Sequence, residues 1–126
     1  VAGVLPAAVR ALLALDVRSR PGDLLVAVGP HIRVAAFEVG EDVAAQIAAA
    51  APTGVPLPRP LIERRGSRRY ANLAALLHAQ MQDLGVQLRH IEDVGGCTFS
   101  EPERFFSHRR DDGRTGRQLG VIQPRG

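Results

Sequence analysis

The run Leu24-Leu25-Val26-Ala27-Val28-Gly29-Pro30 decides how the rest of the chain is arranged. Five apolar residues in succession, closed by a glycine and a proline, predict a short strand that is buried on both faces. The loop that follows such a strand lies at the edge of a sheet, where ligand sites often form. We therefore expect a sheet flanked by helices, with candidate ligand-binding residues after Pro30.

Three helices are predicted along the chain. Apolar side chains recur at helical spacing over residues 4–15. The alanine-rich residues 41–51 begin with two acidic side chains, which the helix dipole favours in a first turn. The third helix extends from an N-cap at Asn72 to a C′ glycine at Gly85. Its apolar stripe consists of Leu73, Leu76, Leu77, Met81 and Leu84.

Further strands are predicted before and after the third helix. Residues 61–63 form a possible short strand, and residues 64–69 form a solvated hairpin or loop around Gly66. Residues 86–91 alternate between apolar and polar side chains, which is typical of a half-buried strand. Residues 118–122 predict a closing strand. This order of elements predicts an α/β fold, a layered α+β sandwich in which a mixed sheet is flanked by helices.

Composition places the chain among folded proteins and excludes several functional classes. Its 126 residues are 45% hydrophobic and 23% charged, which suffices for one modest core. The chain has no apolar run long enough to cross a bilayer, and its single cysteine excludes an internal disulfide framework. We therefore expect a cytoplasmic protein with no membrane partner. The prolines of residues 52–60 indicate a surface loop and not a domain boundary.

The cationic side chains of this sequence are all arginines, and the net charge is +3. Their densest cluster, residues 64–69, has a single aromatic neighbour, Tyr70. Nucleic-acid binding requires a basic face with interleaved aromatic side chains. We therefore expect no nucleic-acid partner.

Residues 97–117 mix aromatic and cationic side chains without a helical or strand period, so they are predicted to line a site. Phe105 and Phe106 are adjacent, and we expect one ring to pack inward while the other covers a ligand. Arg109 and Arg110 offer bidentate donors to an anion such as phosphate or carboxylate. The two aspartates that follow them are alternative partners on the surface.

The cysteine and the histidines leave two interpretations open. Cys97 is either a nucleophile that nearby arginines activate, with His108 as its base, or a small residue buried at a strand end. His31, Cys97 and His108 form either a dispersed site or three unrelated loop positions. His78 is predicted to be a packed or half-exposed helix residue, and His90 to face solvent.

The spacing of residues reveals no phosphate loop and no metal motif. Neither G-x-G-x-x-G nor G-x-x-x-x-G-K-[ST] occurs, and H-E-x-x-H and paired C-x-x-C are missing as well. No metal site can therefore be read from the spacing of residues alone.

Several motifs, in order, resemble those of one family. They are Gly29-Pro30-x-Ile32, Phe37-Glu38-Val39-Gly40, Cys97-Thr98, and Phe105-Phe106-Ser107-x-Arg109-Arg110-Asp111 with Thr115-Gly116-Arg117. Together they look like the C-terminal half of the laccase-domain family, whose members are also labelled multicopper polyphenol oxidase, purine nucleoside phosphorylase or peptidoglycan editing factor. The resemblance implies that residues 1–126 are the C-terminal half of one incomplete α/β domain.

The resemblance also implies an activity, namely that of a zinc-dependent purine nucleoside phosphorylase. Such an enzyme converts adenosine, inosine or guanosine and phosphate into the base and ribose 1-phosphate, and it also deaminates adenosine. Its partners are thus a purine nucleoside and phosphate. Two histidines and a cysteine bind the family's zinc, and copper is an older label. We expect Phe106, Ser107, Arg109 and Arg110 to form a wall beside the substrate, whereas the catalytic residues stay unassigned.

The chain departs from the family pattern in its metal ligands, which the family carries in its N-terminal half. The last ligand belongs to a His-Ala-Gly-Trp-Arg-Gly motif that would fall immediately before Val1. Cys97 matches the Cys-Thr position and not the metal-binding cysteine. His108 stands where the family has tyrosine, and His31 where it has a small residue or cysteine.

The departure predicts that this chain alone binds no zinc and needs its N-terminal segment. The alternatives are a non-catalytic fragment, an amidase that edits peptidoglycan precursors, and a copper-dependent polyphenol oxidase.

Overall fold

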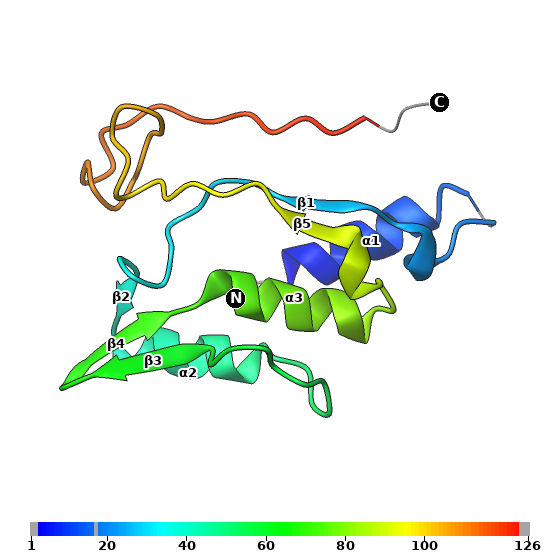
Figure 1. The fold of residues 1–126 in the computed structure, drawn as a ribbon, viewed down its shortest axis with the longest axis horizontal. Helices are drawn as coiled ribbons and strands as arrows, with labels where there is room; N and C mark the ends of the chain where they lie inside the picture. The colour runs from blue at the N-terminus through cyan, green and yellow to red at the C-terminus, as the bar shows by residue number, and fades with distance from the viewer. Residues whose placement is uncertain (1–2, 17, 124–126) are drawn as a thin grey trace.

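The computed structural model describes residues 3–16 and 18–123 of the chain. Within these residues lie three α-helices, two short 3₁₀ helices and five strands, and the strands form a two-stranded and a three-stranded sheet. Figure 1 shows helix α3 (Leu73–Asp83) between the two sheets. The predicted mixed α/β class is therefore confirmed, although the strands are divided between two small sheets.

The three-stranded sheet is built around a tight hairpin. Strands β3 (Ile62–Arg65) and β4 (Arg68–Ala71) pair antiparallel, and β2 (Glu38–Val39) joins the other edge of β4. Gly66 has a φ of 61° at the first position of the two-residue turn, a conformation that a side chain would disfavour. The predicted hairpin around Gly66 is thus confirmed, and its arginines lie within the two strands.

The larger hydrophobic core lies between this sheet and two helices. Helix α2 (Glu41–Ala49) begins with the two predicted acidic residues and packs against β4. Ile47, on the inner face of α2, is only 2% exposed. The buried members of this core are Val39, Ala44, Ile47, Leu61, Ala71, Ala75 and Leu76.

Helix α3 has the two end signals that the sequence predicts. At its start, the Asn72 side-chain oxygen accepts a hydrogen bond from the Ala75 N–H at 3.1 Å. At its end, Gly85 has a φ of 94°, and the Val86 N–H donates to the Met81 carbonyl at 3.0 Å. This closure is a Schellman motif, which satisfies carbonyls that the helix would otherwise leave unpaired.

A smaller core joins α3 to helix α1 (Val4–Leu13), which confirms the first predicted helix. Its buried members are Val9, Met81 and Val86. No helix within the described residues is both long and apolar enough to cross a membrane.

The two-stranded sheet consists of β1 (Val26–Val28) and β5 (Ile91–Asp93), which pair in parallel. Val28 is buried, whereas Ala27 is exposed and Leu25 is 69% exposed. The prediction that this strand is buried on both faces is therefore wrong for its outward face. Among the described residues, no element covers that face, so its apolar side chains contact solvent.

The prediction of a strand over residues 86–91 is also wrong. Leu88–His90 form a 3₁₀ helix, and the strand begins only at Ile91. The Val86 N–H closes the end of α3, and the Val86 side chain packs in the smaller core. The chain therefore turns after Val86, and it pairs with β1 only from Ile91 onward. His90, which was expected to face solvent, lies in this turn and is half-buried.

The closing strand predicted over residues 118–122 is not formed. Figure 1 shows this stretch as an extended segment that runs past the β1–β5 pair. Within the described part of the chain, its backbone makes no hydrogen bond, and Leu119 and Val121 are 91% and 84% exposed. Its apolar alternation suits a strand, but none of the described strands lies at its side to pair with it.

Candidate functional site

The segments that leave β1 and β5 stay side by side beyond the two strands. His31 and Cys97 form a parallel bridge, and the Thr98 N–H donates to the His31 carbonyl at 3.1 Å. The structure thus brings together two members of the predicted dispersed site. The third, His108, lies against Gly113 and makes no hydrogen bond with Cys97.

The close packing of this region depends on Gly96. Its φ is 89°, and a Cβ at this position would lie 2.7 Å from the ring of Phe105. Phe105 is partly buried, and the Arg104 guanidinium lies 4.8 Å from its ring centroid. Phe105 is therefore the ring of the adjacent pair that packs inward.

The ion pair between Arg33 and Asp93, here called the Arg33–Asp93 clasp, joins the two segments across about sixty residues of sequence. Arg33 Nη1 and Nη2 donate to the two carboxylate oxygens of Asp93 at 2.5 and 2.6 Å, and Arg33 Nε donates to the Gly96 carbonyl at 2.9 Å. The hydrogen bonds from Arg33 lower the pKa of Asp93 to about 2, and in turn raise the pKa of Arg33. The pair is therefore ionised throughout the neutral range.

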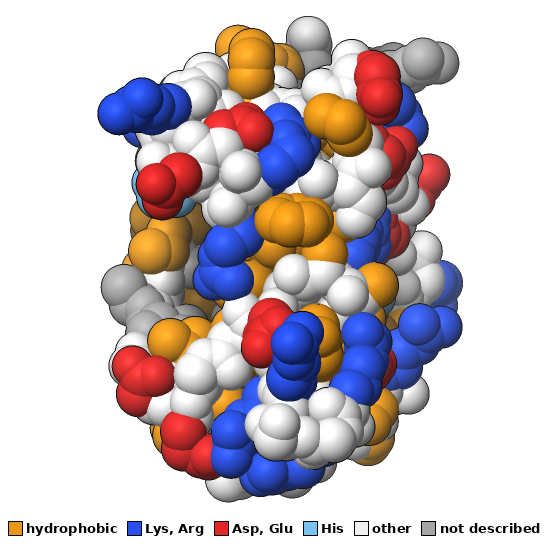
Figure 2. Space-filling view, turned by 90° about the vertical axis from the view of Figure 1, so that its left-hand side faces the viewer, with side chains coloured by type: hydrophobic (Ala, Val, Ile, Leu, Met, Phe, Trp, Pro, Cys, Tyr) orange, Lys and Arg blue, Asp and Glu red, His pale blue; other side chains and the backbone are white. Residues whose placement is uncertain are grey.

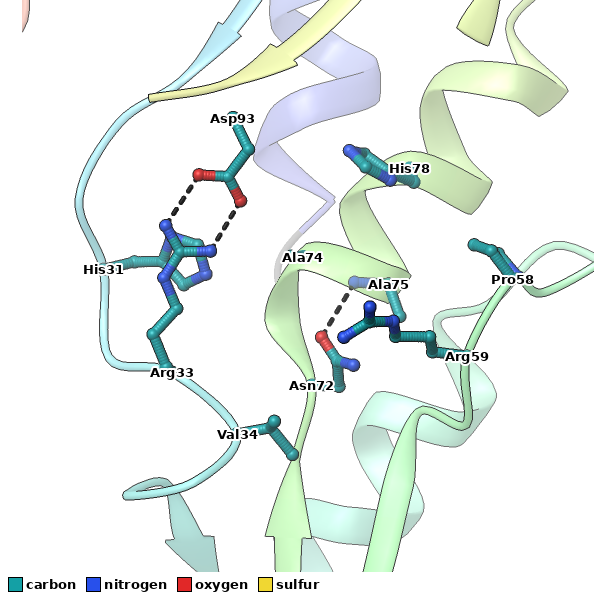
Figure 3. Close-up of a pocket in the computed structure, with 10 residues that line it drawn as sticks. All are labelled: His31, Arg33, Val34, Pro58, Arg59, Asn72, Ala74, Ala75, His78 and Asp93. Atoms are coloured by element: carbon teal, nitrogen blue, oxygen red, sulfur yellow. Dashed lines mark hydrogen bonds and ion pairs between the residues drawn. The ribbon is translucent and has the colours of Figure 1, made fainter. Parts of the chain in front are cut away.

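A cavity of about 390 Å³ opens beside this clasp (Figure 3). It lies between the loop after β1, the first turns of α3 and the proline-rich loop of residues 52–60. Charged and polar side chains line it together with small apolar ones. The lining residues are His31, Arg33, Val34, Pro58, Arg59, Asn72, Ala74, Ala75, His78 and Asp93.

The Cys97 thiol faces polar neighbours within the bridge. Burial raises the pKa of this thiol, but its hydrogen bond with Ser100 at 3.4 Å and the Arg33 N–H at 3.5 Å lower it, and the lowering dominates. The Cys97 N–H donates to Glu101 at 2.5 Å, so the Cys97 backbone also caps the turn that follows. Among the described residues, no histidine is hydrogen-bonded to the sulfur, so this geometry contains no assembled nucleophile–base pair at Cys97.

Arg110 holds the loop of residues 98–111 together. Its Nε and Nη2 donate to the carboxylate of Asp111 at 2.8 and 2.9 Å. Nη1 also donates to the Thr98 carbonyl at 2.8 Å, and Nη2 to the Phe105 carbonyl at 3.0 Å. These hydrogen bonds lower the pKa of Asp111 below its ordinary value. Arg110 therefore engages the surface partner that the sequence offered and also binds the backbone carbonyls of Thr98 and Phe105 in this loop.

Arg109 and Ser107 lie in the same turn but differ in their surroundings. Arg109 is exposed, donates to the Glu38 carbonyl at 2.8 Å and places its guanidinium 5.2 Å from the Phe37 ring centroid. Ser107 is 5% exposed, and its hydroxyl accepts the Arg110 N–H at 3.3 Å. The two adjacent arginines therefore point to different parts of the molecule and do not converge on one anion.

Phe106 is the outward ring of the aromatic pair and is 52% exposed. It lies over Gly116, where a Cβ would approach the ring to 2.8 Å. A second hollow of about 280 Å³ borders this ring. Its other lining residues are Thr98, Ser107, His108, Thr115, Gly116, Arg117 and Gln118.

Arginine side chains gather on the face shown in Figure 2, interspersed with acidic side chains. In the hairpin, Arg65 pairs with Glu63 at 2.8 Å, and Arg69 pairs with Glu41. Arg65 also lies over the ring of Tyr70, 4.2 Å from its centroid. These pairs neutralise much of the cationic charge, and the expectation of no nucleic-acid partner stays a prediction.

The described residues do not supply a zinc site. Across residues 3–16 and 18–123, no three histidine, cysteine or acidic side chains gather closely enough to hold a metal ion. His31 and Cys97 lie together, but no third ligand joins them. That the chain alone binds no zinc stays a prediction.

The fold and the site define an α/β domain whose two parallel strands lead into ligand-sized hollows. Residues 1–125 match the protein family described as multi-copper polyphenol oxidoreductase laccase, and the chain belongs to this family. The resemblance seen in the sequence motifs is thereby confirmed.

Curated relatives with the same region carry a common name. The chain is 39% identical to a purine nucleoside phosphorylase of Deinococcus radiodurans over 86% of its length, and 35% identical to one of Streptomyces coelicolor over 97%. It spans 39% and 46% of the length of these two relatives. The chain thus corresponds to less than half of each relative.

Solved structures give the same result for the fold. The crystal structure of YlmD from Geobacillus stearothermophilus matches with a TM-score of 0.76 and 31% identity, covering 90% of this chain and 41% of that one. The arrangement of helices and strands described above is therefore the arrangement found in this relative.

The sequence pattern did not reveal the clasp or the cavity. Arg33 and Asp93 lie sixty residues apart and belong to no motif. One signal was present, because both residues follow or end the parallel strands at their carboxyl ends, where α/β sheets place ligand sites. Arg59 had no signal at all, since it stands among prolines in a loop without period.

Proposed function

We propose that this chain is part of a cytoplasmic, zinc-dependent purine nucleoside phosphorylase. The reaction would convert adenosine, inosine or guanosine and phosphate into the base and ribose 1-phosphate, with deamination of adenosine as a second activity. The supporting observation is the match of 86% and 97% of the chain to two relatives that bear this name. Because the chain spans less than half of each, the activity is proposed for a polypeptide that carries the rest of the domain as well.

We propose that Phe106, Ser107, Arg109 and Arg110 form a wall beside the nucleoside. Phe106 offers an exposed ring next to a hollow, which suits stacking on a purine base. Arg110 and the buried Ser107 position this ring, because their hydrogen bonds fix the loop that carries it. Arg109 is the exposed cation of the group.

Zinc, on this proposal, is held by residues outside the described part of this chain. It would supply Lewis-acid chemistry to the complete enzyme. The role left to this chain is to bind and orient the nucleoside, and to exclude water from one side of it.

The proposal is tested with inosine and inorganic phosphate on the full-length polypeptide that contains this chain. Hypoxanthine release, followed by chromatography, is expected to require phosphate and to yield ribose 1-phosphate in equal amount. Release that is independent of phosphate, or no release, would contradict the proposal. Zinc content by elemental analysis is expected to reach one ion per full-length polypeptide and none in residues 1–126 alone.

The wall is tested by Arg110→Ala and Phe106→Ala, with Arg64→Ala as the matched control. Arg64 is an exposed hairpin arginine whose side chain forms no hydrogen bond or ion pair with the described residues. We expect kcat/KM for inosine to fall about tenfold or more in the first two variants and to stay unchanged in the control. Unchanged values in all three would remove these residues from the site.

The family description itself names a second candidate, the oxidation of polyphenols with copper. The same preparation, loaded with copper, is assayed with a diphenol and oxygen. A third assay with muropeptides tests the editing amidase. Turnover of either substrate without nucleoside phosphorolysis would assign the protein to that activity instead, and inactivity towards all three would leave the non-catalytic fragment.

A further inference from the structure

The cavity beside the Arg33–Asp93 clasp is lined by Asn72, a buried residue whose amide has only one of its two polar atoms engaged by the described residues. Asn72 is 7% exposed, and its Oδ1 is occupied by the Ala75 N–H at 3.1 Å. Its Nδ2 donates to no acceptor among the described residues, and the side chain lines the cavity. The Asn72 amide N–H groups are therefore available to an oxygen atom of a ligand in the cavity.

Arg59 supplies a second set of free donors at the same cavity. Figure 3 shows its guanidinium extending from the proline-rich loop toward the first turn of α3, beside Asn72. The side chain forms no ion pair or hydrogen bond with the described residues. A guanidinium is planar and presents several N–H groups, so it matches the oxygens of an oxyanion better than a neutral ligand.

The first turn of α3 contributes to the same preference. The helix has eleven residues, and the N–H groups of Leu73 and Ala74 have no acceptor within the described part of the chain. The positive end of the helix dipole therefore points at the cavity floor, where it favours a negative charge. This contribution adds to Asn72 and Arg59 and would not define a site without them.

The one acidic group in the lining does not oppose an anion. Asp93 is held by both terminal nitrogens of Arg33, so the pair contributes no net charge. The remaining titratable side chains are His31 and His78, and the buried Nε2 of His78 also lacks a partner among the described residues. The balance of the lining is therefore cationic and rich in donors.

We propose that this cavity binds a phosphate group, with the Arg59 guanidinium and the Asn72 amide as its principal donors. Its volume of about 390 Å³ lies within the range of roughly 300–1,000 Å³ that small-molecule sites occupy, so a sugar attached to the phosphate also fits. The choice of phosphate among oxyanions rests on the proposed function, in which one substrate and one product carry that group. No lining residue is shared with the hollow beside Phe106.

The experiment is a titration of the full-length polypeptide, in phosphate-free buffer at constant ionic strength, followed by calorimetry. Inorganic phosphate and ribose 5-phosphate are titrated separately to distinguish a free anion from a sugar phosphate. Two variants remove one donor each, Arg59→Gln and Asn72→Asp. The aspartate can still accept the Ala75 N–H as an N-cap, but it replaces the amide donor with a carboxylate.

We expect at least one of the two ligands to bind the unmodified protein, and each variant to weaken that binding by about tenfold or more. Arg64→Gln, which removes an exposed arginine from the hairpin, is the matched control and should change the affinity less than twofold. Absence of binding, or equal losses in Arg59→Gln and Arg64→Gln, would overturn the inference. Unchanged affinity in Asn72→Asp, with α3 intact by circular dichroism, would overturn it as well.

The inference and the proposed function fail in different ways. If nucleoside phosphorolysis is absent but phosphate binding depends on Arg59 and Asn72, the function is wrong and the binding site stands. If phosphorolysis proceeds while neither variant affects binding, the function stands and the site is wrong.

Discussion

The two sheets of this molecule are stabilised in different ways. The β2–β4–β3 sheet shares a core of seven buried residues with α2 and α3, and its strands β3 and β4 are joined by a two-residue turn. The β1–β5 pair joins segments more than sixty residues apart and packs on a core with three buried members. Its outward residues Leu25 and Val94 are 69% and 57% exposed.

Polar clasps replace hydrophobic burial on the β1–β5 side. Arg33 and Arg110 each bind one carboxylate bidentately and also donate to backbone carbonyls of the adjoining loops. Such hydrogen bonds fix the direction as well as the distance between two groups, whereas apolar contacts are not directional. The hairpin side therefore acts as the scaffold, and the side chains of Arg33 and Arg110 position the loops that carry the candidate site.

The largest effect is expected from a core residue of the scaffold. Ile47→Ala should lower the free energy of unfolding by about 3 kcal/mol, because it leaves a cavity in the larger core. Leu119→Ala, in the 91% exposed segment, should change it by less than about 0.5 kcal/mol. Urea unfolding of both variants measures the two free energies of unfolding. Equal decreases in the two variants would show that residues 118–122 are packed in solution.

A smaller effect is expected from the clasp in the loop. Arg110→Gln should destabilise the protein by about 2 kcal/mol, because Asp111 and the Thr98 and Phe105 carbonyls lose their donor. Arg109→Gln removes the same charge but a single hydrogen bond, so its cost should stay near 0.5 kcal/mol. Hydrogen exchange of residues 98–106 should accelerate in the first variant only. Similar exchange in both would mean that Arg110 does not hold the loop.

The smallest effect concerns acid stability. The pKa of Asp93 is lowered from 3.8 to about 2 in the folded protein, so the ionised carboxylate stabilises the fold above about pH 4. This contribution is lost as the pH falls from about 4 towards 2, and solvent near the pair limits it to about 1 kcal/mol. Unfolding between pH 2 and 5 should show this loss, and Asp93→Asn should remove that part of the pH dependence. An identical pH profile in the variant would contradict the assignment.

Local signals predicted the scaffold well. Asn72 caps α3 and Gly85 ends it, because each residue type satisfies backbone groups that the helix leaves unpaired. Gly66 marks the hairpin turn for a similar reason. These features depend on a few neighbouring residues, so a single sequence carries the information.

The other sheet was predicted less well because its determinants are distant in sequence. Residues 86–91 alternate as a strand would, but Val86 belongs to the end of α3 and to the smaller core. Among the residues predicted to form a wall, Phe106 borders a hollow, and its role there stays a prediction. The different surroundings of Arg109 and Arg110 follow from contacts with Glu38 and Thr98. No periodicity encodes such contacts, so adjacent arginines look alike until the chain is folded.

The position of the loop that carries Phe105 depends on the absence of a Cβ atom at Gly96. A methyl group there would meet the Phe105 ring at 2.7 Å, and the backbone conformation would also be strained. The Phe105 ring would have to move, and so would the Phe105 carbonyl that accepts a hydrogen bond from Arg110. We therefore expect a random library of this chain to retain glycine at position 96 more strictly than arginine at position 33 or 110.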